Sequence, residues 1–207
     1  PESGSVVLPD INLDPEITSS LSRVVLLACG TSYHAALVGR VLIERLTGLP
    51  AEVDVASEWR YRDAPVGPDT LVVALSQSGE TADTLGAVKA ARLKGAPIVG
   101  ITNVVGSALA REATGIVYTP AGPEIGVASS KTFTATIMAS YLLALWLSRH
   151  RGTLTPEAGR QHVQGLLELP RLIEKTLELD AAVATLAREL TRFKDFLFFA
   201  RGIHFPI

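Results

Sequence analysis

The stretch Asp69-Thr-Leu-Val-Val-Ala-Leu75 leads directly into Ser76-Gln-Ser-Gly-Glu-Thr81. Its first half is a continuous aliphatic run, which is typical of a parallel strand that is buried on both faces. Its second half is polar and opens a segment of helical period that extends to residue 93. The stretch therefore predicts a strand, a tight polar loop and a helix, which together form the repeating unit of a parallel α/β sheet.

The same alternation recurs on both sides of this stretch. Short apolar runs that predict strands are joined by helical segments, so we expect a doubly wound, flavodoxin-like sheet of five parallel strands with helices on both faces. The predicted strands are 24–29, 52–56, 69–75, 97–102 and 115–119. The helices that follow them are predicted at 32–46, 80–93, 107–112 and 132–149.

The chain changes character after residue 150. Two more helices are predicted at 156–179 and 180–194, and Phe196-Leu-Phe-Phe-Ala200 then predicts an extra strand. A buried-type strand with no helix after it indicates a piece of a longer protein. The alternative is an edge strand or a tail that packs on the existing sheet. We divide the chain into an N-terminal extension (1–20), an α/β domain (21–150) and a C-terminal part (151–207).

Composition excludes several classes of function. The formal net charge of −2 gives no electrostatic footprint for nucleic acid or for an anionic membrane. The most apolar stretch, 132–147, contains three Thr and one Ser and is shorter than the ~20 residues that a membrane span needs, so we expect a buried helix. The single cysteine, Cys29, is expected in the core and favours a reducing compartment, which predicts a cytoplasmic protein.

Two polar loops follow strands at the edge of the predicted sheet where such folds bind ligands. The loop Ser76–Thr81 combines hydroxyl donors with free backbone N–H groups at a helix N-terminus, which is an arrangement that favours phosphate. Gly30-Thr31-Ser32 repeats this design after the first strand and predicts a second wall of the same pocket. The alternative for the first loop is plain helix capping, with Ser78 as N-cap.

A third loop, Gly122-Pro-Glu-Ile-Gly-Val-Ala-Ser-Ser-Lys131, is neither a Walker A loop nor a dinucleotide turn. Ser130 stands where a Walker A loop needs Gly, and no Gly-x-Gly-x-x-Gly follows Cys29. The four histidines share no metal-ligand spacing, so we expect neither metal nor cofactor. Glu58 and Glu124 could act as acid or base, but solvated or capping roles are favoured, because no second group is tied to either by spacing.

Four motifs, in this order, resemble one family. They are Ala28-Cys-Gly-Thr-Ser-Tyr33, Ala56-Ser-Glu-Trp-Arg-Tyr-Arg62, Leu75-Ser-Gln-Ser-Gly-Glu-Thr-Ala-Asp-Thr-Leu85 and Gly122-Pro-Glu-Ile-Gly-Val-Ala-Ser-Ser-Lys131. They resemble the first sugar isomerase (SIS) half of the glucosamine-6-phosphate synthases, which are isomerizing glutamine–fructose-6-phosphate aminotransferases. The resemblance extends from about Val24 to the last residue, where 201–207 resembles the opening of a second SIS half.

This resemblance implies a site for a sugar phosphate. The residues implied to hold the phosphate of fructose 6-phosphate or glucosamine 6-phosphate are Ser76, Gln77, Ser78 and Thr81. Those implied to line the sugar are Thr31, Ser32, Val127 and Ser129. In the family, ammonia from glutamine is joined to fructose 6-phosphate through a lysine Schiff base and proton transfer by a glutamate.

The sequence departs from the family where the chemistry is done. The glutaminase domain and the second SIS half, which carry the family's catalytic groups, are absent from it, and Lys131 does not match the Schiff-base lysine. We therefore expect no catalytic residue here and a chain that binds sugar phosphate without converting it. Two alternatives stay open: a non-catalytic sugar-phosphate-sensing SIS module of a regulator, and a glutaminase-free sugar-phosphate isomerase or deaminase. Because SIS domains usually pair, a homodimer is expected.

Overall fold

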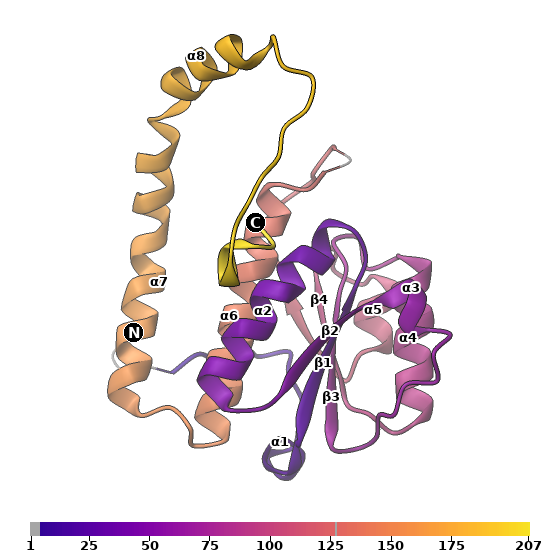
Figure 1. Ribbon diagram of the computed structural model, residues 1–207. Coiled ribbons are helices and arrows are strands. Elements are labelled where there is room, and N and C mark those ends of the chain that lie inside the picture. The colour runs from indigo at the N-terminus through magenta and orange to yellow at the C-terminus, as the bar shows by residue number, and fades with distance from the viewer. Residues whose placement is uncertain (1–4, 127) are drawn as a thin grey trace.

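The computed structural model, which describes residues 5–126 and 128–207, is built around a five-stranded sheet (Figure 1). The strand order is β2-β1-β3-β4-β5, and each neighbouring pair is parallel. The strands are β1 (Arg23–Ala28), β2 (Ala51–Val55), β3 (Thr70–Leu75), β4 (Ile98–Thr102) and β5 (Gly115–Tyr118). The predicted doubly wound sheet is confirmed, and each strand bound lies within one residue of its prediction.

The central strand, β3, is buried over its whole length, as its aliphatic sequence predicts. Its side chains alternate between two apolar cores. Leu71, Val73 and Leu75 face one core, whereas Val72 and Ala74 face the other. Burial of each large aliphatic side chain stabilises the fold by about 2 kcal/mol, so β3 anchors both layers at once.

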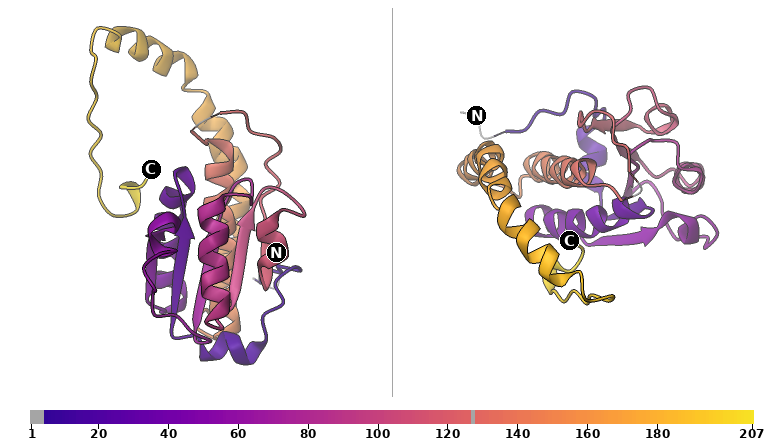
Figure 2. Two further views of the ribbon diagram at one scale, coloured as in Figure 1. Left: turned by 90° about the vertical axis from the view of Figure 1, so that its right-hand side faces the viewer. Right: turned by 90° about the horizontal axis from the view of Figure 1, so that it is seen from above.

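Helices cover both faces of the sheet. The first core lies under α2 (Thr31–Thr47) and α6 (Lys131–His150). The second lies under α3 (Ala56–Trp59), α4 (Ala82–Leu93) and α5 (Ala108–Glu112). Figure 2 shows these two helical layers with the sheet between them. The short helix α3 and the helix α1 (Pro15–Ser20), which precedes β1, are not predicted by the sequence.

The segment before α1 covers part of the sheet edge at β5. Ile11 forms an isolated antiparallel bridge with Gly115, and the Ile116 amide donates to the Asp10 carbonyl at 3.0 Å. The side chains of Ile11 and Leu13 are buried in the first core. The described part of the N-terminal extension therefore packs on the domain, and it satisfies backbone groups that an edge strand would leave unpaired.

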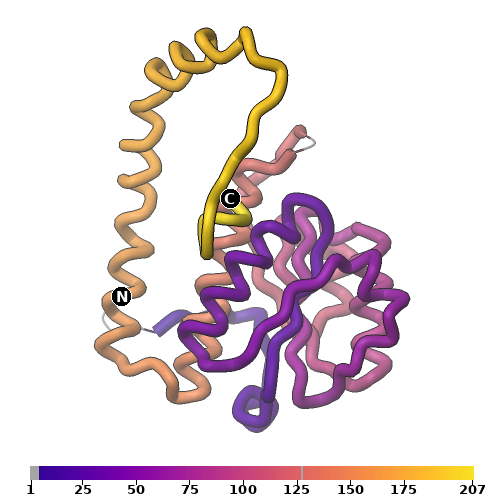
Figure 3. The backbone as a smooth tube through the Cα atoms, viewed as in Figure 1, coloured from indigo at the N-terminus to yellow at the C-terminus, as the bar shows by residue number. Residues whose placement is uncertain are grey.

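Beyond α6, the chain leaves the sheet as an arm (Figure 3). The arm consists of α7 (Pro156–Leu177), which lies beside α6, and α8 (Asp180–Leu190), and the chain then returns to a short 3₁₀ turn, η1 (Gly202–His204). The extra strand predicted at 196–200 is wrong, because this segment has no strand pairing in the described structure. Phe198 and Phe199 are 94% and 87% exposed, since no neighbouring strand or helix covers them.

The contact between α2 and α6 depends on a residue without a side chain. A Cβ on Gly39 of α2 would lie 3.1 Å from the Ser140 Cβ of α6 and 3.2 Å from a Leu26 methyl group. We predict that Gly39→Val lowers the free energy of unfolding by about 2 kcal/mol through overpacking, as measured by urea denaturation. The matched control is Gly165→Val in α7, where no atom lies within 4 Å. Equal losses in the two variants would contradict this account of the interface.

Candidate functional site

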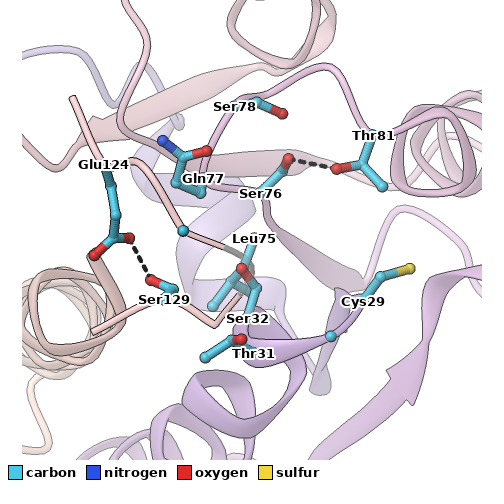
Figure 4. Close-up of a pocket in the computed structure, with 12 residues that line it drawn as sticks. Cys29, Thr31, Ser32, Leu75, Ser76, Gln77, Ser78, Thr81, Glu124 and Ser129 are labelled. Carbon is cyan, nitrogen blue, oxygen red and sulfur yellow. Dashed lines mark hydrogen bonds between the residues drawn. The ribbon is translucent and has the colours of Figure 1, made fainter. Parts of the chain in front are cut away.

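The three predicted loops meet in one pocket at the carboxyl edge of the sheet (Figure 4). The cavity has a volume of about 280 Å³. Its lining residues are Cys29, Gly30, Thr31, Ser32, Leu75, Ser76, Gln77, Ser78, Thr81, Glu124, Gly126 and Ser129. The structure thus brings together the predicted site residues that it describes, whereas Val127 lies outside the described residues. Their role in binding stays a prediction.

The loop after β3 is folded by its own hydrogen bonds. The Gly79 amide donates to Ser76 Oγ at 3.0 Å, and Ser76 Oγ and Thr81 Oγ1 lie 3.0 Å apart within hydrogen-bonding distance. Gly79 has a φ of +67°, and a Cβ there would lie 2.2 Å from Ser107 Oγ. Only glycine fits this position, because the left-handed conformation and the close contact both exclude a side chain. The loop is therefore preformed for a ligand.

The N-terminus of α4 faces this loop without a side-chain cap. The N-cap residue is Thr81, and its side chain makes no capping hydrogen bond. The alternative in which Ser78 caps the helix is wrong, because Ser78 lies three residues before the N-cap residue Thr81, and its Oγ accepts from the Glu80 amide at 3.2 Å. The first amides of α4 thus lack a side-chain acceptor, and a helix N-terminus of this kind attracts an anion.

The loop after β1 forms the second wall. Helix α2 begins at Thr31, and its N-cap, Gly30, has a φ of +57° and no side chain to cap the helix. Thr31 and Ser32 therefore present hydroxyl groups beside a second uncapped helix N-terminus. Cys29 is only partly buried: it packs on the second core and lines the pocket, rather than lying fully in the core as expected.

The third wall is held by Glu124. Its carboxylate accepts hydrogen bonds at the N-terminus of α6, so the capping role favoured by the sequence is confirmed. The hydroxyls of Thr132 and Ser129, followed by backbone amides, lower the pKa of this carboxyl from 4.5 to about 2. The sequence did not place Glu124 in the pocket, because it reaches the helix from a loop and not from a standard capping position.

The pocket offers neutral donors and almost no charge. Among its described lining residues, none is Lys, Arg or His, and Glu124 is the one carboxylate. Lys131 points its ammonium to the Pro123 carbonyl at 2.6 Å, and His34 is exposed on α2.

In the described part of the chain, no three His, Cys, Asp or Glu side chains gather as a metal site would require. Every helix described is also too short or too polar to cross a bilayer.

Comparisons with known proteins match this arrangement. The SIS domain family matches residues 17–146. The isomerizing glutamine–fructose-6-phosphate aminotransferase of Symbiobacterium thermophilum is 47% identical over 205 residues, which are 99% of this chain and 34% of that protein. The corresponding protein of Methanosarcina acetivorans is 42% identical over 204 residues, with 99% and 33% covered. The chain therefore spans about a third of the length of these relatives.

A solved structure shows the same fold. The C-terminal domain of glucosamine-fructose-6-phosphate aminotransferase from Francisella tularensis is 33% identical and superposes with a TM-score of 0.92. The superposition covers 98% of this chain and 57% of that one. The sequence motifs and the three-dimensional fold thus indicate the same group of proteins.

The lowered pKa of Glu124 predicts how the stability of the fold changes at acidic pH. Because the folded-state pKa is depressed from 4.5 to about 2, the ionised carboxylate stabilises the fold above about pH 4.5, and this contribution is lost as the pH falls towards 2. We predict that Glu124→Gln shows a weaker pH dependence of the free energy of unfolding between pH 4.5 and pH 2 than the wild type.

Urea denaturation at a series of pH values measures this difference. The control is Glu178→Gln, the same change at the exposed C-terminus of α7. If the wild type and Glu124→Gln lose stability equally over this range, the hydrogen bonds described above do not hold the carboxylate in its ionised form.

Proposed function

The chain belongs to the SIS domain family, and on that premise we propose that it is the first sugar-phosphate-binding half of an isomerizing glutamine–fructose-6-phosphate aminotransferase. The observation that carries the proposal is the preformed loop Ser76–Thr81, whose hydroxyl-bearing residues line the pocket beside the uncapped N-terminus of α4. Such a loop suits the phosphate of fructose 6-phosphate or glucosamine 6-phosphate.

The neutral character of the site supports a ligand that binds and leaves. With no lysine or arginine among the described lining residues, the phosphate is held by dipoles and hydroxyls, which bind more weakly than full positive charges. The hydroxyls of Thr31, Ser32 and Ser129 can both donate and accept hydrogen bonds, as the hydroxyls of a sugar do. A cavity of about 280 Å³ suits a small polar metabolite rather than a dinucleotide.

The relatives favour this function over a sensor. The matching proteins from Symbiobacterium thermophilum and Methanosarcina acetivorans are both aminotransferases, at 47% and 42% identity over nearly the whole chain. A regulator would need only the binding site, whereas the similarity here continues through the arm beyond α6. A glutaminase-free isomerase or deaminase is the alternative, and it would use the same phosphate loop.

In this proposal, residues 151–207 connect two SIS halves. The Phe196–Ala200 segment has the composition of a buried strand, yet it lies exposed and unpaired in the described structure. We propose that it becomes a strand of a second sheet in a longer protein. The 57% coverage of the Francisella tularensis domain supports this division, because that domain is larger than the present chain.

The proposal also covers the cellular compartment and the oligomeric state of the chain. The single free thiol, Cys29, suits a reducing compartment, so we place the chain in the cytoplasm. We also propose self-association to a homodimer. Its support is the apolar surface of the arm, which no second sheet covers in the described structure, whereas the apolar side chains of α6 are buried or half-buried.

The loop Ser76–Thr81 predicts that the chain prefers a phosphorylated sugar. We expect isothermal titration calorimetry to show that the chain binds fructose 6-phosphate but not fructose. Ser78→Ala and Thr81→Val should each weaken binding about tenfold, because each removes a hydroxyl that faces the phosphate. The control, Thr185→Val, removes an exposed hydroxyl of α8 that bonds only its own helix, and it should leave the affinity unchanged.

Two results would contradict the proposal. Equal binding of fructose and fructose 6-phosphate would show that the loop does not hold a phosphate. Formation of glucosamine 6-phosphate from fructose 6-phosphate and ammonia by this chain alone would show that the catalytic groups lie here and not in a second half.

The exposed arm predicts that the chain associates with itself. Phe196, Phe198 and Phe199 expose apolar surface, so we expect light scattering to report a dimer that dissociates when the three are changed together to Ser. The control is Ile125→Ser, which removes an exposed apolar side chain of the loop before α6. A strict monomer at all concentrations of the wild-type chain would contradict the proposed association.

A further inference from the structure

Three helices begin at the pocket, and only one of them has its N-terminus filled. Helices α2 and α4 start at Thr31 and Ala82, and neither N-cap residue makes a side-chain capping bond. The N-cap of α6, Ser130, makes none either, but the first amides of α6 bond the Glu124 carboxylate. The pocket thus has two helix N-termini open to an anion and a third that already holds one.

The contacts of Glu124 are dense. Its Oε1 accepts from the amides of Ser130 and Lys131, both at 3.0 Å. Its Oε2 accepts from Ser129 Oγ at 2.7 Å and from the Thr132 hydroxyl. Figure 4 shows the Glu124–Ser129 bond on the wall opposite the bond between Ser76 and Thr81. One carboxylate therefore satisfies the helix amides and orients a hydroxyl that lines the pocket.

The loop that carries Glu124 is itself held at its start. Asn103 donates to the Gly122 carbonyl at 2.8 Å and accepts from the Ala121 amide at 2.9 Å. Lys131 Nζ donates to the Pro123 carbonyl at 2.6 Å. These bonds hold the backbone immediately before Glu124, and the hydrogen bonds of the carboxylate itself hold it at the N-terminus of α6, so Glu124 is a fixed group.

Whether the N-terminus of α6 is filled affects where an anion can bind, because the pocket is small. Helix α6 has 20 residues, and the positive end of its dipole would attract the same phosphate group that the N-terminus of α4 attracts. We propose that Glu124 is a built-in anion that fills the N-terminus of α6, so that phosphate is confined to the Ser76–Thr81 loop and Ser129 is oriented towards the sugar. Glu124 is thus a positioning residue, and this inference rests on the proposed sugar-phosphate function.

The test is a titration of the chain with inorganic phosphate, followed by the NMR shifts of single backbone amides. In the wild type we expect the amides of Gly79 and Ala82 to respond, whereas those of Lys131 and Thr132 do not. In Glu124→Ala and in Glu124→Gln, we expect the amides of Lys131 and Thr132 to respond as well, because a second anion can then reach α6. Glu124→Gln is nearly isosteric, so it answers the question if Glu124→Ala fails to fold.

Two matched variants separate this role from a general effect. Asp14→Asn makes the same carboxylate-to-amide change at the N-terminus of α1, where Asp14 accepts from the Glu16 amide at 2.8 Å, and it should titrate like the wild type. Ser129→Ala keeps the carboxylate and removes the oriented hydroxyl. It should weaken fructose 6-phosphate binding about fivefold without opening α6 to phosphate.

The outcomes are distinct. A response of the α6 amides in the wild type, or silence of these amides in both Glu124 variants, would overturn the inference. Silence of Gly79 and Ala82 in the wild type would instead overturn the proposed phosphate site. In that case the α6 amides of the variants still decide whether Glu124 fills the helix N-terminus.

Discussion

The parallel pairing of β1 with β3 is the constraint on which the rest of the structure depends. Because these strands are neighbours and parallel, the loops that follow them leave the same edge of the sheet side by side. The helices after them then diverge, since α2 packs on one core and α4 on the other. A crevice opens between such diverging connections, and this is where α/β folds bind ligands. The site is a consequence of strand order.

This geometry gives the pocket its chemistry. Each parallel strand is followed by a helix whose positive end points back to the sheet edge, so the pocket gathers several helix N-termini without needing a charged side chain. That arrangement binds an anion but does not by itself choose where the anion sits. The loop sequences decide this: the loop after β3 provides no side-chain cap for the first amides of α4, whereas the loop before α6 contributes the Glu124 carboxylate.

The sequence predicted those elements that depend on a local pattern of residues. Its predictions failed where contacts between residues far apart in the sequence determine the structure. Continuous aliphatic runs predicted the buried strands such as β1 and β3, because buried parallel strands need apolar side chains on both faces. The same pattern misassigned 196–200, since a strand needs a neighbour and the described chain provides none there. Glu124 was seen as a capping residue but not as part of the pocket, because its bonds to α6 depend on how the loop between them folds back.

The hydrogen bonds of Glu124 also limit the chemistry that this carboxylate can do. A general base must be able to take up a proton near neutral pH, and the one carboxylate among the described lining residues has its pKa lowered to about 2 by the hydroxyls and amides that it accepts. The hydrogen bonds that make Glu124 a good helix cap therefore make it a poor base. Under the proposed function, the uncapped helix N-termini of the pocket would hold the phosphate, and Glu124 would position the loop before α6 without taking part in proton transfer.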